Sequence, residues 1–263
     1  MDLGIKNKVA LVTAASQGLG KASAMELANE GVKLAICSRD QDKINQTAEE
    51  IQNLSGVEVL AVKADLDSTD DIENLIKEIE KKFNTVDILV NNTGGPKAGF
   101  FDDLSDEDWL KTFESTFLSA VRVTRKVLPF MKKNKWGRII NISSVSAKQP
   151  IDNLMLSNGV RMSIHGWAKT LSNQVASENI LINNVCPGFT HTERVDALIK
   201  TQVENSNSSR EEIIESIASD IPAKRVGQAN ELAALVVFLS SEKASYITGQ
   251  SIAVDGGISS LPI

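Results

Sequence analysis

The sequence predicts an α/β fold in which helices cover both faces of a doubly wound parallel sheet. Short runs of valine, isoleucine and leucine alternate with longer amphipathic segments along almost the whole chain. Most of these runs contain no polar residue, which is typical of strands that are buried on both faces. Each intervening segment is long enough for a helix, and right-handed crossovers then place helices on both sides of the sheet.

Seven apolar runs are the predicted strands, at residues 9–13, 32–37, 57–62, 86–90, 138–142, 180–185 and 251–254. Helical patterns lie beside them, over residues 18–30, 40–54, 69–83, 106–132, 156–178 and 228–240. Glycine and proline mark the strong breaks, and Ser105 with Asp108 is typical of a capped helix start. Because no internal repeat or linker interrupts the alternation, residues 1–263 are expected to form a single domain.

The composition argues against some classes of partner. The chain has 263 residues and a formal net charge of −6. Nucleic acids and anionic membranes bind proteins through clustered Lys and Arg. Because this chain has a net negative charge, neither is expected as a partner. No run approaches the roughly 20 apolar residues of a membrane span, and the first residues lack the pattern of a signal peptide. We therefore expect a cytoplasmic protein.

The cysteines and histidines predict no metal site. Cys37 and Cys186 each end an apolar run and are expected to be small buried side chains. His165 and His191 lack carboxylates at metal-binding spacing, so no metal is expected. His165 lies beside Gly166 on a predicted helix, where we expect packing or capping and assign it no chemical role.

The segment KTQVENSNSS, at residues 200–209, is polar and has almost no apolar anchor. Two interpretations are open: a solvated surface loop, or part of a mobile substrate lid over residues 190–220. The lid hypothesis rests on the position of the segment after a strand end, where α/β folds bind their ligands.

A glycine-bearing turn, TAASQGLG at residues 13–20, connects the first predicted strand to the first predicted helix. Glycines in such a turn let the backbone approach a pyrophosphate, which then binds the amide groups and the positive dipole end of the helix. A tight turn without a ligand would look similar, but the strand–turn–helix context favours a dinucleotide.

Five motifs together resemble the short-chain dehydrogenase/reductase family, and most of all its 3-oxoacyl-[acyl-carrier-protein] reductase-like subgroup. They are TAASQGLG (13–20), NNTGG (91–95), NISSV (141–145), NNVCPGFTHT (183–192) and YITGQSIAVDGG (246–257), in the order and spacing of the family. The resemblance implies a Rossmann-type sheet of about seven strands and a homodimer or homotetramer. It also implies hydride transfer between a nicotinamide cofactor and a small carbonyl or alcohol substrate.

The resemblance further implies a set of cofactor contacts. They are Thr13, Ser16, Gln17, Gly18, Leu19 and Gly20 at the pyrophosphate, Asp65 and Leu66 at the adenine, Asn91 and Gly94 at the ribose, and Pro187, Gly188, Thr190 and Thr192 at the nicotinamide. Ala14 stands where the family has its first glycine. If that position requires a positive φ, the alanine costs about 1 kcal/mol.

The residues after the second predicted strand favour NADP(H) over NAD(H). Family members that prefer NAD(H) present a carboxylate to the ribose hydroxyls there, whereas this chain has Ser38 and Arg39. A hydroxyl and a guanidinium suit a 2′-phosphate. Asp40, one place further on, is expected to cap a helix. Gln17 stands where many NADP(H)-binding members have a second basic residue.

The catalytic positions depart from the serine, tyrosine, lysine and asparagine of the family. Ser144 matches the serine, and Thr116 stands at the asparagine position. Ser157 stands at the tyrosine position and Arg161 at the lysine position, and their i,i+4 spacing places both on one helix face. An aliphatic hydroxyl is far less acidic than a phenol, and an arginine stays protonated, so it cannot relay a proton. We expect a site that binds the cofactor but donates a proton poorly.

Two functional hypotheses follow. The first is an NADP(H)-dependent oxidoreductase in which Ser144 contacts the carbonyl oxygen, Arg161 anchors the ribose, and Ser157 is a weak proton relay. The second is a non-catalytic NADP(H)-binding protein that acts as a sensor or regulatory subunit. His191 and Lys97 are candidates for another proton donor, although an exposed loop residue is the simpler interpretation of each.

Overall fold

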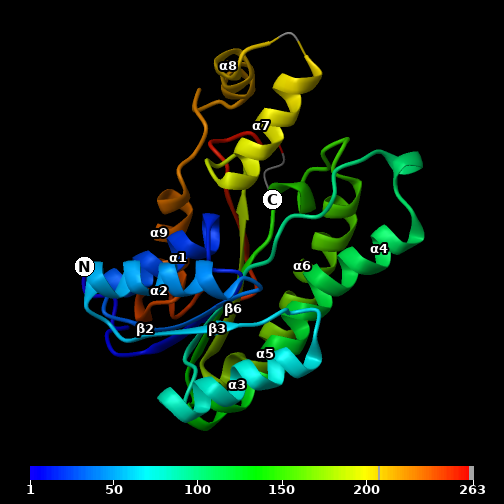
Figure 1. Ribbon diagram of the computed structural model, residues 1–263. Coiled ribbons are helices and arrows are strands. Elements are labelled where there is room, and N and C mark those ends of the chain that lie inside the picture. Colours follow the sequence, from blue (N-terminus) through cyan, green and yellow to red (C-terminus); the bar gives the residue numbers. More distant parts are fainter. Residues whose placement is uncertain (207, 261–263) are drawn as a thin grey trace.

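The computed structural model describes residues 1–206 and 208–260, apart from the side chains of residues 194, 201, 202 and 205. The described chain forms a seven-stranded parallel sheet in the order β3-β2-β1-β4-β5-β6-β7, so the winding direction reverses between β1 and β4 (Figure 1). The strands are β1 Val9–Val12, β2 Lys33–Ser38, β3 Val59–Lys63, β4 Ile88–Asn91, β5 Gly137–Ile142, β6 Ile180–Pro187 and β7 Ser251–Val254. Each predicted run overlaps one strand, with ends that differ by up to two residues, and the sheet confirms the doubly wound α/β fold.

The sheet has a hydrophobic core on each of its faces. Along β1, Ala10 and Val12 contribute to the core on one face, and Leu11 contributes to the core on the other. Every residue of β4 and β5 is buried. Uninterrupted apolar strands are stable here because both faces are removed from water by helices.

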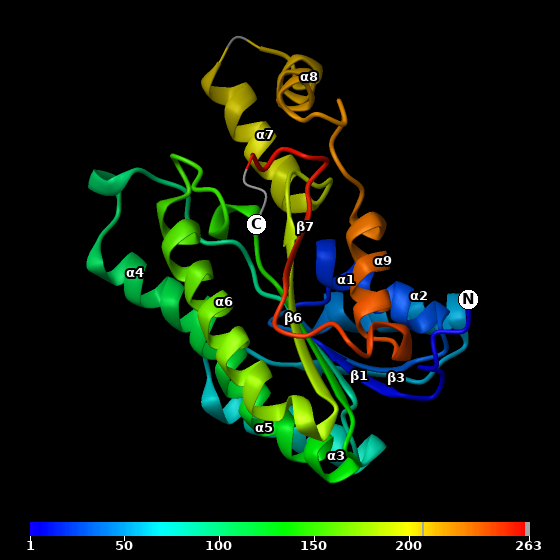
Figure 2. The ribbon, with the colours of Figure 1, turned by 180° about the vertical axis from the view of Figure 1, so that it is seen from behind.

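Six helices cover the two faces of the sheet (Figures 1 and 2). One face carries α1 (Gly18–Asn29), α2 (Gln41–Ser55) and α9 (Ala229–Leu239), and the other carries α3 (Thr69–Phe83), α5 (Ser119–Asn134) and α6 (Met155–Val175). Asp40 caps α2, since its carboxylate accepts a hydrogen bond from the backbone amide of Lys43 at 3.1 Å. The prediction that Asp40 is a helix cap is therefore confirmed.

The pattern over residues 106–132, predicted as one helix, is divided into three segments. Helices α4 (Asp106–Thr112) and α5 flank a π-helical turn, Phe113–Leu118. Ser105 and Asp108 form a reciprocal capping box at the start of α4, as the sequence predicts. A π-helical turn continues the helical run without a break, so the apolar pattern alone does not reveal it.

Two further helices, α7 (Glu193–Asn205) and α8 (Arg210–Asp220), extend beyond the carboxyl ends of the strands (Figure 1). They correct the interpretation of residues 200–209 as a surface loop. Residues 200–205 continue α7, and the Ser209 hydroxyl caps α8 by accepting from the Glu212 amide at 3.2 Å. Ile199 is buried and anchors α7, although its neighbours are polar. Movement of these helices as a lid stays a prediction.

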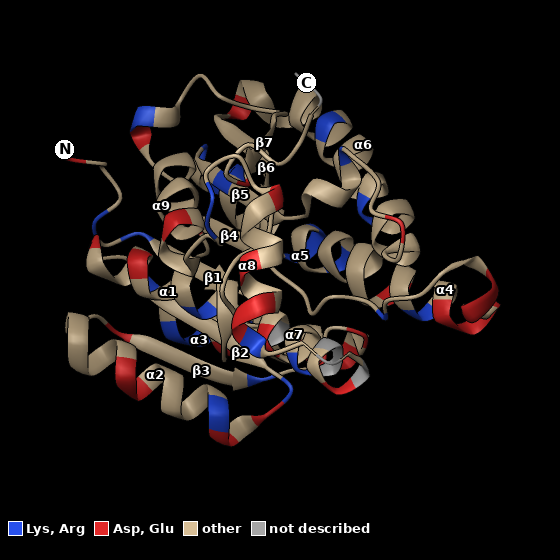
Figure 3. Ribbon diagram, turned by 90° about the horizontal axis from the view of Figure 1, so that it is seen from above, with Lys and Arg blue, Asp and Glu red and all other residues tan. Residues whose placement is uncertain are grey.

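Charged residues of both signs are distributed over the helices (Figure 3). Acidic residues occupy the first turns of α4, α7 and α8, where the positive end of the helix dipole favours a carboxylate. Within the described part of the chain, no helix is both long enough and apolar enough to cross a membrane.

Candidate active site

A cavity of about 360 Å³ opens at the carboxyl ends of the strands. Ligands of doubly wound sheets bind at this edge, where the order of the strands reverses. The glycine turn, the loop after β4, the end of β5, α6 and the start of α7 all contribute to the lining. Arg161 is the one charged side chain among the described residues that line the cavity.

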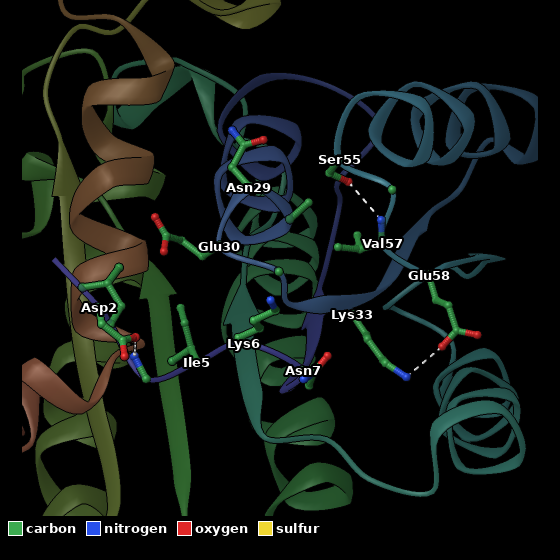
Figure 4. Close-up of a pocket in the computed structure, with 15 residues that line it drawn as sticks. Asp2, Ile5, Lys6, Asn7, Asn29, Glu30, Lys33, Ser55, Val57 and Glu58 are labelled. Atoms are coloured by element: carbon green, nitrogen blue, oxygen red, sulfur yellow. Dashed lines mark hydrogen bonds and ion pairs between the residues drawn. The ribbon is translucent and has the colours of Figure 1, made fainter.

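A second hollow, of about 610 Å³, lies at the opposite edge, beside the amino ends of β1 and β2 (Figure 4). Its charged side chains carry both signs, and three of them bond to neighbouring groups. Lys33 forms an ion pair with Glu58 at 2.9 Å, and the Asp2 carboxylate accepts a hydrogen bond from the Gly4 amide at 2.9 Å. These groups do not converge on one point, so the smaller cavity is the candidate site.

The turn between β1 and α1 is shaped to accept an anion. Gln17, the N-cap residue of α1, makes no side-chain capping bond within the described chain, and the first helical turn carries no acidic residue. The first backbone amides and the positive end of the helix dipole therefore face the turn. Gly20 is needed for close packing, since a Cβ there would lie 2.5 Å from the Ala14 carbonyl oxygen. These features fit the pyrophosphate of a dinucleotide.

Ala14 adopts a left-handed backbone conformation, with φ of 46°. Its position is therefore one that favours glycine, as in the family motif. For a residue with a Cβ this conformation costs about 1 kcal/mol. The turn keeps its shape in spite of this cost.

Asn92 joins the glycine turn to the loop after β4. Its side-chain amide donates to the Ala14 carbonyl oxygen at 3.1 Å, and its backbone amide donates to Thr13 Oγ1 at 2.8 Å. Asn92 lines the cavity, whereas the Asn91 side chain is buried in the sheet. The Asn91 side chain points away from the cavity because successive residues of a strand point to opposite faces, and the expected position of Asn91 beside the ribose stays a prediction.

Asn91 instead begins a buried ladder of side chains. Its amide donates to Asn141 at 2.9 Å, and the Asn141 amide donates to Asn184 at 2.9 Å. Asn184 in turn donates to the Ser251 hydroxyl at 2.9 Å. These residues are direct partners in register from β4 to β7, so the ladder holds the register of four strands near the site.

The end of β2 presents Arg39 to solvent at the carboxyl edge. Ser38 is buried, and its hydroxyl donates to the carbonyl oxygen of Asp40 at 2.9 Å. The guanidinium is therefore the exposed member of the predicted pair. The loop after β3 lies nearby: burial and the neighbouring Asp65 raise the pKa of Asp67, and the positive charge of Arg39 opposes that rise.

Ser144 and Ser157 both line the cavity. Ser144 Oγ accepts a hydrogen bond from the Ser146 backbone amide at 3.1 Å, which leaves its hydroxyl hydrogen available for a ligand. Ser157 is 6% exposed, and its Oγ lies 2.9 Å from Ser146 Oγ. The hydroxyl at the predicted tyrosine position is therefore hydrogen-bonded to the loop after β5.

Arg161 lies one helical turn after Ser157 and is buried in the cavity wall. One of its terminal nitrogens donates to the carbonyl oxygens of Ile142 and Ser143, each at 3.1 Å. The guanidinium thereby holds the end of β5 against α6. It also places a fixed positive charge in an otherwise uncharged lining, within the part of the chain that the structure describes.

Other predicted chemical groups lie outside the cavity lining. Thr116 is 2% exposed, lies within the π-helical turn and does not line the cavity. Its expected catalytic role stays a prediction. Lys97 forms an ion pair with Asp108 at 3.0 Å. His165, expected only to pack or cap, lies with Nε2 2.9 Å from Ser143 Oγ.

The predicted cofactor residues fall into two groups. Those that line the cavity are Leu19, Pro187, Gly188, Thr190 and Thr192. The others lie outside the lining, on the glycine turn and at the ends of β1 to β4: Thr13, Ser16, Gln17, Gly18, Gly20, Ser38, Arg39, Asp65, Leu66, Asn91 and Gly94. Sequence reasoning did not identify Asn92, Gln149, Leu198 or Ile258 as lining residues. Strand alternation indicates that Asn91 and Asn92 face opposite sides but not which of them faces the cavity, and no local signal marks the other three.

A family model described as enoyl-(acyl carrier protein) reductase matches residues 13–259. The chain belongs to the short-chain dehydrogenase/reductase family. Within this family it is 35% identical over 254 residues to the NADPH-dependent reductase BacG of Bacillus subtilis, covering 96% of this chain and 98% of the relative. It is 34% identical over 253 residues to the 3-oxoacyl-[acyl-carrier-protein] reductase FabG of Staphylococcus epidermidis, covering 96% of this chain and 99% of the relative.

Solved structures of short-chain dehydrogenases/reductases superpose on nearly the whole chain. YwfH, described as an NADPH-dependent reductase involved in bacilysin biosynthesis, has a TM-score of 0.92 at 35% identity, covering 97% of this chain and 100% of that one. The L-sorbose reductase of Gluconobacter frateurii, in complex with NADPH and L-sorbose, has a TM-score of 0.96 at 31% identity, covering 99% and 100%.

Proposed function

We propose that this short-chain dehydrogenase/reductase is an NADP(H)-dependent oxidoreductase that interconverts a small carbonyl compound and its alcohol. The observation that carries the proposal is a cavity whose wall includes Ser144, Arg161 and Thr192 beside the glycine turn. The relatives support it, because BacG is named an NADPH-dependent reductase and the L-sorbose reductase was solved with NADPH.

The cofactor would lie along the carboxyl edge of the sheet. The uncapped amides at the start of α1 would bind its pyrophosphate, and the exposed Arg39 guanidinium would pair with a 2′-phosphate. Thr192, at the start of α7, would contact the nicotinamide carboxamide. When bound, the nicotinamide supplies or accepts the hydride.

Ser144 would polarise the substrate carbonyl. Its Oγ already accepts from the Ser146 amide, so its hydrogen can be donated to the substrate oxygen. Arg161 would hold the cofactor ribose and favour negative charge as it develops on that oxygen, since a fixed charge acts strongly in a cavity from which water is excluded. Leu154 and Leu198 contribute apolar wall that excludes water.

Proton donation would be the weak step of the reaction. A positioned general acid contributes typically about 10²–10⁴-fold, and neither Ser157 nor Arg161 supplies one of useful acidity. Positioning and electrostatic stabilisation do not need that acid. We therefore propose an activated carbonyl as the substrate, for example a 1,2-dicarbonyl compound, because the oxyanion it forms is less basic than that of a simple ketone.

A second candidate is a non-catalytic NADP(H)-binding protein that acts as a sensor or regulatory subunit. The observation that favours it is the hydrogen bond between Ser157 and Ser146, which gives the residue at the tyrosine position a structural partner. The phosphate end of the site retains family residues, whereas three of the four catalytic positions carry other residue types.

A fluorescence titration with NADPH and, in parallel, NADH tests the proposal, followed by a panel of simple and activated carbonyl compounds. We expect NADPH to bind much more tightly than NADH, and a 1,2-diketone to be reduced. Ser144→Ala should lower turnover about tenfold or more, whereas Ser163→Ala, outside the cavity lining, should not change it. NADPH binding without any turnover would favour the sensor, and no binding of either nucleotide would overturn both candidates.

We also propose that the protein is a homo-oligomer. Phe100, Phe101 and Leu110 are 59%, 71% and 71% exposed around α4, and large apolar side chains gathered on one region favour a protein partner. Light scattering coupled to size-exclusion chromatography would give the mass, and a monomer at micromolar concentration would contradict the proposal.

A further inference from the structure

His165 connects three elements of the fold immediately behind the cavity. It lies on α6, four residues after Arg161 and eight after Ser157, so the three side chains share one face of the helix. Its Nε2 lies 2.9 Å from Ser143 Oγ, at the end of β5, and 3.7 Å from Cys186 Sγ, at the end of β6. His165 therefore contacts both strand ends that border the site.

Ser143 is held by three separate hydrogen bonds. Its backbone amide donates to the Val185 carbonyl oxygen on β6 at 2.8 Å, and its own carbonyl oxygen accepts from Arg161 at 3.1 Å. Its hydroxyl is paired with His165. Two side chains of helix α6, Arg161 and His165, therefore bond to Ser143 from positions one turn apart. The next residue along the chain is Ser144.

The charges around His165 favour its neutral form. Burial, together with the positive charges of Lys148 and Arg161, lowers the pKa of His165 to about 4. Burial raises the pKa of the Cys186 thiol to about 11, so the sulfur stays protonated. A hydroxyl and a thiol that both face Nε2 can act as its donors, which suits an unprotonated ring nitrogen.

We propose that His165 is a positioning residue for the active site, which acts through Ser143 to orient Ser144 and Arg161 toward the cavity. The inference rests on the proposed function, since it states how the groups that would face the substrate are held. Arg161 and His165 both fix the end of β5 through Ser143, and loss of the His165 contact would let Ser144 shift. Misplacement by about 1 Å is enough to lower turnover about 10²-fold in well-oriented sites.

Substitutions at His165 separate positioning from general stability. A glutamine amide reaches the place of Nε2, whereas an asparagine amide reaches only the place of Nδ1. We expect His165→Leu and His165→Asn to lower kcat for a 1,2-diketone about tenfold or more, and His165→Gln to recover most of it. Ser143→Ala should resemble His165→Leu, and the double variant should lose no more than either single variant.

The matched control is Thr170→Val, an exposed residue of the same helix whose hydroxyl donates within α6. All variants are assayed below their melting temperatures, together with their Kd for NADPH. Equal kcat in wild type and His165→Leu, or equal losses in the leucine and glutamine variants, would overturn the positioning role. Failure of the proposed function appears instead in the wild type, as absent turnover. In that case the Kd for NADPH is compared among the variants instead, because Arg161 would contact the cofactor. We expect the leucine and asparagine variants to bind NADPH more weakly and the glutamine variant to recover most of the affinity.

Discussion

The hydroxyl oxygens of Ser157 and Ser146 lie 2.9 Å apart, so the residue at the predicted tyrosine position is hydrogen-bonded to the loop that follows β5. Both side chains are buried. The short serine side chain leaves the cavity open where a longer side chain would extend into it, since Ser157 is part of the cavity wall. The same wall carries Arg161 one turn further along α6.

This relationship predicts the effect of restoring the family residues. Ser157→Tyr combined with Arg161→Lys would add a phenol whose pKa a neighbouring ammonium lowers toward a useful range. For simple ketones, we expect NADPH oxidation to rise at least about tenfold, toward the 10²–10⁴-fold that a general acid contributes. Ser157→Phe with Arg161→Lys is the control, because it adds the ring without the hydroxyl. Equal rates in the two double variants would show that no phenol acid operates at this position.

Arg39 should set the preference for the phosphorylated cofactor. Arg39→Ala removes the exposed guanidinium at the end of β2, so the Kd for NADPH should rise about tenfold or more while that for NADH changes little. Arg125→Ala, an exposed arginine on α5, is the matched control for a general loss of positive charge. A parallel loss of affinity for both nucleotides would argue against a 2′-phosphate contact.

Ala14 should be a site of stored backbone strain. Because its φ is 46°, Ala14→Gly should raise the free energy of unfolding by up to about 1 kcal/mol, less the added chain entropy of glycine. Urea denaturation of the two proteins measures the difference. Ala22→Gly within α1, at a partly exposed position, is the control and should be destabilising by roughly 0.5–1 kcal/mol. A lower free energy of unfolding in Ala14→Gly than in the wild type would contradict the prediction that Ala14 is strained.

His165 should make stability depend on pH in the weakly acidic range. Its pKa is about 4 in the folded chain and 6.5 in its ordinary state, so the unfolded chain binds more protons between these values. Stability should therefore fall as the pH drops from 6.5 to about 4, by about 2 kcal/mol once partial exposure is allowed for. Urea denaturation of wild type and His165→Gln at pH 7.5 and pH 5 isolates this effect. Identical pH slopes in the two proteins would refute it.

Much of the fold follows from local patterns in the chain. The apolar runs identify all seven strands, because burial on both faces requires continuous apolar residues whatever surrounds them. Asp40 and the pair Ser105 and Asp108 mark helix starts through hydrogen bonds to residues three places away. The positive φ at Ala14 follows from the shape that a glycine turn requires. Each of these features depends on residues close together in sequence.

Contacts between distant segments decided the rest. Residues 200–205 are helical because Ile199 is buried against the protein, which outweighs the polar composition around it. Asn92 rather than Asn91 lines the cavity because the Asn91 side chain bonds to Asn141 on the neighbouring strand β5.

At the candidate active site, the sequence by itself determined that Ser157 and Arg161 stand at the predicted tyrosine and lysine positions, and the absence of a phenol acid there stays a prediction. Only the tertiary structure decided their partners. Ser157 bonds to Ser146 across 11 residues, and His165 bonds to Ser143 across 22. No local periodicity encodes such pairs, since they form only when α6 packs against the ends of β5 and β6.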